Sequence, residues 1–156
     1  MNALAILPEI QEALNKDKNH PMHGFAVIYF QQVAWGDMDS FGHVNNVVYY
    51  TYAQNARIYY NSQLNLFNEN TFSVMAASSC QYFKPVTHPD TLWIGVRVKK
   101  IGKASLIHEY TYYSTVSNTI VAKGESVLVY LDKASGQKKN IDESKKAAIS
   151  AFDSIN

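Results

Sequence analysis

The sequence predicts an α+β fold in which a curved antiparallel sheet wraps around one long apolar helix. Three observations lead to this prediction. Residues 46–64 have helical spacing and are apolar on nearly every side, with Arg57 as the only charged residue, so this helix requires a layer that covers it. Four strand-like segments follow, separated by turns. In the last segment Ala122, Gly124 and Ser126 form a face of small residues that lets a helix approach the sheet closely.

The chain before the long helix is predicted to hold a short helix and one strand. Apolar residues over 4–16 have roughly helical spacing, and Pro8 lies near the start, where a helix tolerates proline. Residues 15–24 are polar and are typical of a linker. Residues 25–35 are rich in β-branched and aromatic side chains and predict a strand. A turn-rich loop over 36–46 then leads into the long helix.

The second half of the chain is predicted to form strands over residues 72–84, 91–101, 105–117 and 120–132. The separators at 102–103 and 117–119 are short enough for hairpins, which predicts an antiparallel meander. Residues 142–153 are predicted to be a polar helix or a frayed terminus. We therefore expect an N-terminal helix and linker over 1–20, a main domain over 25–132 and a C-terminal polar extension over 133–156.

Composition excludes several classes of protein. The 156 residues are 47% hydrophobic, which is enough to build a core in one domain. A net charge of +1 without a basic stripe predicts no nucleic-acid partner, and the lack of a long apolar run predicts no membrane partner. The single cysteine, Cys80, cannot form an intrachain disulfide, and the first eight residues lack the features of a signal peptide. We therefore expect a cytoplasmic protein.

Residues 35–46 concentrate side chains that can carry chemistry. Asp37 and Asp39 are followed by His43 and two asparagines, directly before the predicted helix. Unpaired amides at a helix N-terminus carry partial positive charge and can hold a carbonyl oxygen as it becomes an oxyanion. Asp39 could then attack the carbonyl carbon or activate a water. The pattern indicates acyl transfer.

Other interpretations of this loop remain open from the residues alone. Asp and Asn before a helix are also ordinary caps. Asp37, Asp39 and His43 could ligate a metal, but no further ligand follows at a suitable spacing, so we predict no metal site. The sequence contains neither a Gly-x-Ser-x-Gly motif nor a Gly-rich phosphate loop. Cys80 lies among apolar neighbours and is expected to be inert.

Residues 35–50, WGDMDSFGHVNNVVYY, resemble the signature of hotdog-fold acyl-CoA thioesterases of the 4-hydroxybenzoyl-CoA thioesterase-like family. That signature is an aromatic residue, then Asp-x-Asp-x-x-Gly-x-Val, then an aromatic-rich helix. The Ala56-Arg57 pair and the segment 82–86 also resemble parts of the family pattern. The resemblance covers residues 25–132.

The resemblance implies a hotdog fold and hydrolysis of an acyl-CoA or acyl-carrier thioester to a free acid and a thiol. It places the catalytic carboxylate, as nucleophile or general base, at Asp39, and the oxyanion-binding amides at Asn46 and Val47. It implies no cofactor apart from coenzyme A as part of the substrate. Candidate substrate-binding residues are His43, Tyr49, Tyr50 and Lys84.

Two alternative functions fit the same fold. Dehydratases and hydratases among the hotdog relatives use an acid paired with a histidine, and Asp39 and His43 could fill those roles. A non-catalytic domain that binds acyl thioesters would keep the fold without turnover, and the presence of Asp39 argues against it.

The resemblance also implies a homodimer or homotetramer with active sites at the dimer interface. An apolar outer face of the last strand would support such assembly, and its residues are Val121, Val127, Val129 and Leu131. Basic residues that could bind the phosphates of coenzyme A are Lys84, Arg97, Lys99, Lys100 and Lys103.

Overall fold

The computed structural model describes residues 8–154, and its helices and strands follow the predicted order. These are α1 (Pro8–Lys16), β1 (Val27–Gln32), η1 (Trp35–Asp37, a 3₁₀ turn), α2 (Val48–Gln63), β2 (Thr71–Tyr82), β3 (Thr91–Ile101), β4 (Ser105–Ser114), β5 (Thr119–Asp132) and α3 (Glu143–Asp153). None of the helices in this part of the chain combines the length and hydropathy needed to cross a membrane.

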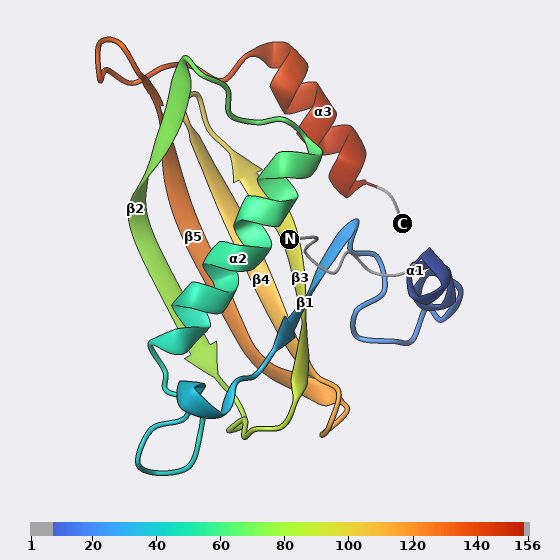
Figure 1. Ribbon diagram of the computed structural model, residues 1–156. Coiled ribbons are helices and arrows are strands. Elements are labelled where there is room, and N and C mark those ends of the chain that lie inside the picture. The colour runs from blue at the N-terminus through green and yellow to red at the C-terminus, as the bar shows by residue number, and fades with distance from the viewer. Residues whose placement is uncertain (1–7, 155–156) are drawn as a thin grey trace.

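The five strands form one antiparallel sheet in the order β1-β3-β4-β5-β2, and α2 lies along its concave face (Figure 1). The predicted α+β class, with a curved sheet around one long helix, is confirmed. The meander prediction holds for β3 to β5 and is wrong for β2, which pairs with β5 at the far edge. Strand β2 therefore has a neighbour on one side only.

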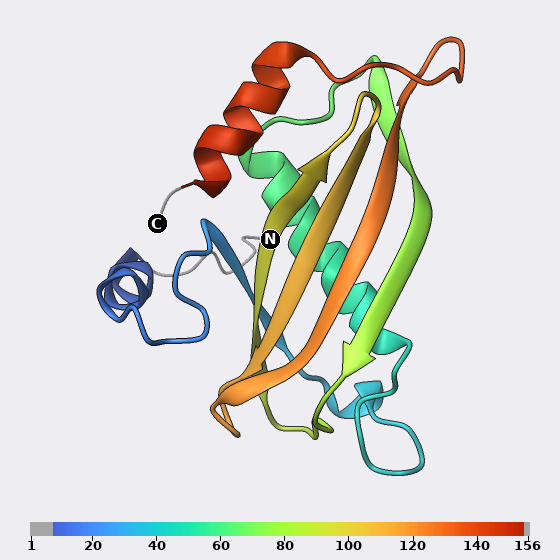
Figure 2. The ribbon, with the colours of Figure 1, turned by 180° about the vertical axis from the view of Figure 1, so that it is seen from behind.

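Strand and helix boundaries differ from the prediction near the N-terminus. Strand β1 ends at Gln32, because the Val33 amide donates to the Asp90 carbonyl (2.9 Å) and the chain then turns into η1. The predicted helix over 4–16 is found from Pro8 to Lys16, and its first four residues lie outside the described residues. A second, smaller core joins Leu14 of α1 to Ile28 and Tyr113 of the sheet, and Figure 2 shows α1 beside the sheet from behind.

Helix α2 packs one face onto the sheet through five buried residues, which are Tyr49, Tyr52, Ala53, Ala56 and Tyr60. The expectation that it is covered on nearly every side is wrong for a single chain, since Ile58 is 59% exposed. The small-residue face of β5 points to the inside, but the expectation that it lets the helix approach closely is wrong. The rings of Tyr110 and Tyr112 occupy that space, 3.7 and 3.8 Å from where a Cβ at Gly124 would be.

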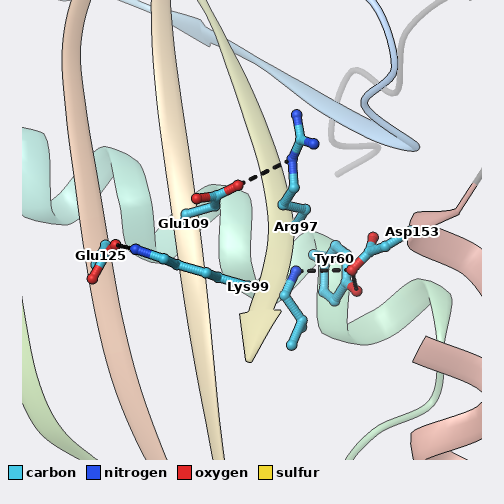
Figure 3. A network of polar contacts seen from close by, with 7 residues as sticks. Tyr60, Arg97, Lys99, Glu109, Glu125 and Asp153 are labelled. Carbon is cyan, nitrogen blue, oxygen red and sulfur yellow. Dashed lines mark hydrogen bonds and ion pairs between the residues drawn. The ribbon is translucent and has the colours of Figure 1, made fainter. Parts of the chain in front are cut away.

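The outer face of the sheet carries ion pairs. Arg97 pairs with Glu109 (3.2 Å), and Lys99 pairs with Glu125 (Figure 3). The expectation of an apolar outer face is wrong for Val121, because an irregular register between β4 and β5 places it in the main core. Val127, Val129 and Leu131 are half-buried and alternate along β5 with inward-facing residues, so they lie on the outer face as expected.

Helix α3 is docked onto the main core. Its Ile149 is buried there, and one oxygen of Asp153 accepts hydrogen bonds from the Tyr60 hydroxyl (2.7 Å) and the Val98 amide (2.8 Å) (Figure 3). Burial raises the pKa of the Asp153 carboxyl. The region predicted as a helix or a frayed terminus is therefore a helix fixed to α2 and β3.

Candidate active site

The loop between η1 and α2 is a closed turn with defined anchors. Met38 and Val44 form a β-bridge, and the Val44 amide donates to the Val86 carbonyl (2.8 Å). Gly42 has φ +80°, a left-handed conformation that favours glycine. The loop projects beyond the sheet at the N-terminal end of α2 (Figure 1). Its base is therefore fixed while its tip faces outward.

Asp39 lies in this turn and is half-buried. Its Oδ1 accepts a hydrogen bond from the Phe41 amide (2.9 Å), and its backbone amide donates to the His43 carbonyl (2.9 Å). Within residues 8–154 its Oδ2 accepts only a long hydrogen bond, from Asn45 Nδ2 (3.5 Å). One carboxylate oxygen thus orients the group, and the other is available to a substrate or a water.

Asp37 is tied into the protein. Its Oδ2 accepts hydrogen bonds from the Ala34 amide (2.9 Å) and from the hydroxyl of buried Tyr52 (2.5 Å). Burial, and then the hydrogen bond to Asp37, raise the pKa of Tyr52. Asp37 therefore fastens η1 to α2 and fixes where the Asp39 turn begins.

Asn45 organises the start of α2. Its side-chain Oδ1 accepts from the Val47 amide (2.9 Å), and its carbonyl accepts from the Val48 amide (2.9 Å). Between residues 8 and 154, no acceptor is recorded for the Asn46 amide. Of the two amides predicted to bind the oxyanion, the one at Asn46 is open and the one at Val47 already has a partner. Asn45 was not among the predicted site residues, although Asp and Asn before the helix were recognised as ordinary caps.

Three tyrosine rings line the inner side of this helix end. Tyr49 contacts Tyr82 (ring centroids 5.0 Å apart) and Tyr112 (5.5 Å), both edge-on. The Tyr82 hydroxyl donates to the Asn46 carbonyl (2.8 Å) and so links β2 to the helix start. Burial raises the pKa of Tyr49 to about 12 and also raises that of Tyr82, so both phenols are protonated at neutral pH. Tyr82 was missed as a site residue, although it begins the 82–86 segment.

The predicted substrate-binding residues occupy different environments. Tyr49 is 3% exposed and Tyr50 is 38% exposed. His43 and Lys84 are exposed, and neither side chain has a hydrogen-bond or ion-pair partner within residues 8–154. The structure therefore brings Tyr49 to the helix start as a packing residue and does not join the His43 ring to the Asp39 carboxylate.

Other chemistries find little support at this site. In the described part of the chain, no three His, Cys, Asp or Glu side chains are grouped so that they could hold a metal ion. Burial raises the pKa of the Cys80 thiol, which opposes formation of a nucleophilic thiolate. Of the two carboxylates beside the helix start, Asp39 is held less tightly, because Asp37 Oδ2 accepts hydrogen bonds at 2.9 and 2.5 Å whereas Asp39 Oδ2 accepts only one at 3.5 Å among the described residues.

Large apolar side chains are exposed around the turn. Trp35, before Asp39, is 75% exposed, Phe41, after Asp39, is 86% exposed, and Phe83, after β2, is 56% exposed. A carboxylate, an open helix-start amide and an apolar rim can together hold a carbonyl group and deliver a nucleophile to it.

The chain is similar to known proteins over most of its length. Residues 33–149 match the family model of the Thioesterase-like superfamily. The uncharacterized protein YsmA of Bacillus subtilis (strain 168) is 33% identical over 107 residues, which are 67% of this chain and 72% of YsmA.

Solved structures are also similar. A thioesterase from Thermus thermophilus, complexed with coenzyme A and Zn, is 32% identical with a TM-score of 0.74, covering 85% of this chain and 98% of that one. A thioesterase-superfamily structure from Jannaschia sp. CCS1 has a TM-score of 0.80 and covers 97% of this chain and 94% of that one, but at 18% identity it supports the fold alone.

Proposed function

This chain belongs to the thioesterase-like superfamily, and from that premise we propose that it hydrolyses an acyl-CoA or acyl-carrier thioester to a free acid and a thiol. Family membership supports thioester hydrolysis in general. The observation that carries the specific proposal is the position of Asp39 in the turn that leads into the start of α2, where its Oδ2 accepts only a long hydrogen bond from Asn45 among the described residues.

In the proposed reaction the Asp39 carboxylate acts as general base or nucleophile. As general base it takes a proton from water while the water oxygen bonds to the acyl carbon. The carbon–sulfur bond then breaks, and the proton passes to the leaving thiolate. As nucleophile it forms an anhydride with the acyl group and releases the thiolate. Water then cleaves the anhydride and restores the carboxylate, and the proton that the water gives up passes to the thiolate. Both routes convert one thioester and one water into one acid and one thiol.

The oxyanion is proposed to bind at the amides of Asn46 and Val47. The Asn46 amide needs no rearrangement. The Val47 amide would turn from Asn45 Oδ1 to the substrate oxygen, or share its hydrogen between them. Both amides lie at the positive end of the α2 dipole, which favours the negative charge that develops on the oxygen.

A coenzyme A thioester is the proposed form of the substrate. The relative from Thermus thermophilus, complexed with coenzyme A, supports a ligand of this kind. Among the basic residues considered for its phosphates, Arg97 and Lys99 already pair with glutamates on the outer face. Lys84 is exposed directly after β2 and is the better candidate.

We also propose that the protein works as a homodimer or homotetramer. Strand β2 is an edge strand of twelve residues without a charged residue or a proline, which are the usual protections of an open edge. Val74 and Met75 are each 42% exposed there. Pairing of β2 with β2 of a second copy would cover this edge.

The experiment is to incubate the protein with a panel of acyl-CoA thioesters and to measure thiol and free acid together. Equal amounts of both, from at least one substrate, are expected. A double bond gained or lost without thiol release would instead support the dehydratase or hydratase alternative. Tight binding of the panel without any product would support the non-catalytic alternative.

A further inference from the structure

A cavity of about 580 Å³ lies beside the C-terminal half of α2, next to β2 and β5. Its size is within the range of small-molecule sites. Part of the lining is apolar, from Phe67, Met75 and Leu128, and part is polar, from Asn61 and Ser73. Arg57 is the one charged residue in the lining described.

Arg57 is held in place by neutral groups. Its Nη1 donates to the Tyr110 hydroxyl (3.1 Å) and to Ser126 Oγ (3.4 Å), and the Tyr110 hydroxyl donates to Ser126 (3.0 Å). Both partners are buried residues of the sheet. For the hydrogens on Nε and Nη2, no acceptor is recorded within residues 8–154. The guanidinium is thus fixed on one side, and its remaining donors are free for a ligand.

The charge on Arg57 has no counter-ion in the described part of the chain. None of the ion pairs there includes it. The nearby ring of His108 is buried and contacts Asn61 Oδ1 through Nε2 (3.2 Å). Burial, and then the charge on Arg57, lower the pKa of His108 to about 3, so this ring is neutral at physiological pH. A half-buried cation without an anion is costly for the protein alone, and a bound anion would offset that cost.

We infer that this cavity binds the far end of the acyl group and that Arg57 selects acyl chains ending in a carboxylate. This inference rests on the proposed function and names its substrate class: thioesters of dicarboxylic acids. A carboxylate matches the planar fork of a guanidinium, and an apolar chain matches the aromatic and aliphatic side of the lining.

The presence of one cation in the cavity favours a ligand with a single carboxylate over the nucleotide end of coenzyme A. The phosphates of coenzyme A carry several negative charges, whereas the cavity offers one guanidinium among neutral and apolar groups. Arg57 lies nine residues after Val48, about 14 Å along the helix at 1.5 Å per residue. Helical side chains lean toward the helix N-terminus, so the guanidinium of Arg57 lies nearer to the thioester carbon than its Cα does.

The test compares octanoyl-CoA with octanedioyl-CoA, the thioester of equal length that ends in a carboxylate. The wild type is expected to show at least ~10-fold higher kcat/KM for octanedioyl-CoA, the order expected for a hydrogen-bonded charge pair. In Arg57→Gln the ratio of kcat/KM for octanedioyl-CoA to kcat/KM for octanoyl-CoA should be near one. Its kcat/KM for octanoyl-CoA should stay within about threefold of the wild-type value, because a methyl terminus makes no charge contact. Arg97→Gln, which removes an arginine on the outer face, should keep the wild-type ratio.

A wild type without this preference, or Arg57→Gln with the preference intact, would overturn the inference. So would a change of oligomeric mass in Arg57→Gln, because the counter-ion would then come from a second copy. If Arg57→Gln fails to fold, Arg57→Lys keeps the charge without the fork and should have a reduced preference.

The inference can be separated from the proposed hydrolysis by calorimetric titration with octanedioate and octanoate. Wild-type protein should bind octanedioate more tightly, and Arg57→Gln should not discriminate. If the protein prefers octanedioate but hydrolyses no thioester, the proposed function is contradicted and the anion site at Arg57 is supported. If it hydrolyses thioesters but binds octanedioate and octanoate equally, the proposed function is supported and the anion site is contradicted.

Discussion

The buried ring of His108 makes the stability of this protein depend on pH in a way that can be calculated. The ring is fully buried, its Nδ1 has no partner in the described residues, and Tyr60 packs edge-on against it (5.4 Å). Its pKa is lowered from 6.5 to about 3, first by burial and then by the charge on Arg57. Between these two values the unfolded chain binds a proton that the folded chain does not. Stability is therefore complete above pH 6.5 and is lost as pH falls toward 3.

The size of the effect follows from the two pKa values. Lowering the pH from 7 to 5 should reduce the free energy of unfolding by about 2 kcal/mol through this group, since each pH unit inside the window is worth about 1.4 kcal/mol. Urea unfolding at pH 7 and pH 5, for the wild type and His108→Gln, measures it. Other groups titrate in both proteins, so the variant should lose about 2 kcal/mol less than the wild type. Equal losses in the two proteins would refute the reasoning.

Three further predictions concern the site and the assembly. Val47→Pro should fold, because Val47 has φ −67° and proline is tolerated at a helix start. Its kcat should fall by ~10²–10³, because one oxyanion donor is lost. A folded variant with normal kcat would leave the Asn46 amide as the donor. Tyr52→Phe should lower the free energy of unfolding by about 1.5–3 kcal/mol, because the Asp37 carboxylate loses a buried donor. An unchanged midpoint of urea unfolding would show that the Tyr52 hydroxyl does not stabilise η1. Light scattering at micromolar concentration should give at least twice the 17.6 kDa chain mass, and Val74→Lys should lower it; a 17.6 kDa wild type would contradict the assembly proposal.

Most of the fold could be predicted because it depends on local patterns. The apolar spacing of α2 and the hairpin turns between β3, β4 and β5 are visible in short windows of sequence. The position of β2 beside β5 could not be predicted, since a turn before β3 favours a hairpin, whereas the observed pairing joins residues about fifty apart. The inward position of Val121 depends on a register irregularity with β4 that no local pattern shows.

The sequence predicts where the candidate site lies, and the contacts that organise it required the structure. Asp39 and the helix start are adjacent in sequence, so their proximity follows from the chain itself. Two asparagines precede α2, and only the structure shows that it is Asn45 whose side chain accepts from the Val47 amide. Arg57 is visible as the lone charge of the helix, but its partners are 53 and 69 residues away in sequence. Its role therefore required the structure.

The central claim is that the Asp39 carboxylate drives thioester hydrolysis, and the most direct measurement compares Asp39→Asn with His43→Ala on one acyl-CoA substrate. Both residues lie in the same turn between η1 and α2, so the pair separates loss of the carboxylate from disturbance of the loop. With melting curves like the wild type, Asp39→Asn should lose at least ~100-fold in kcat, and His43→Ala should lose much less. Normal turnover in a folded Asp39→Asn protein would contradict the account, and equal loss in both variants would favour an acid–histidine pair instead.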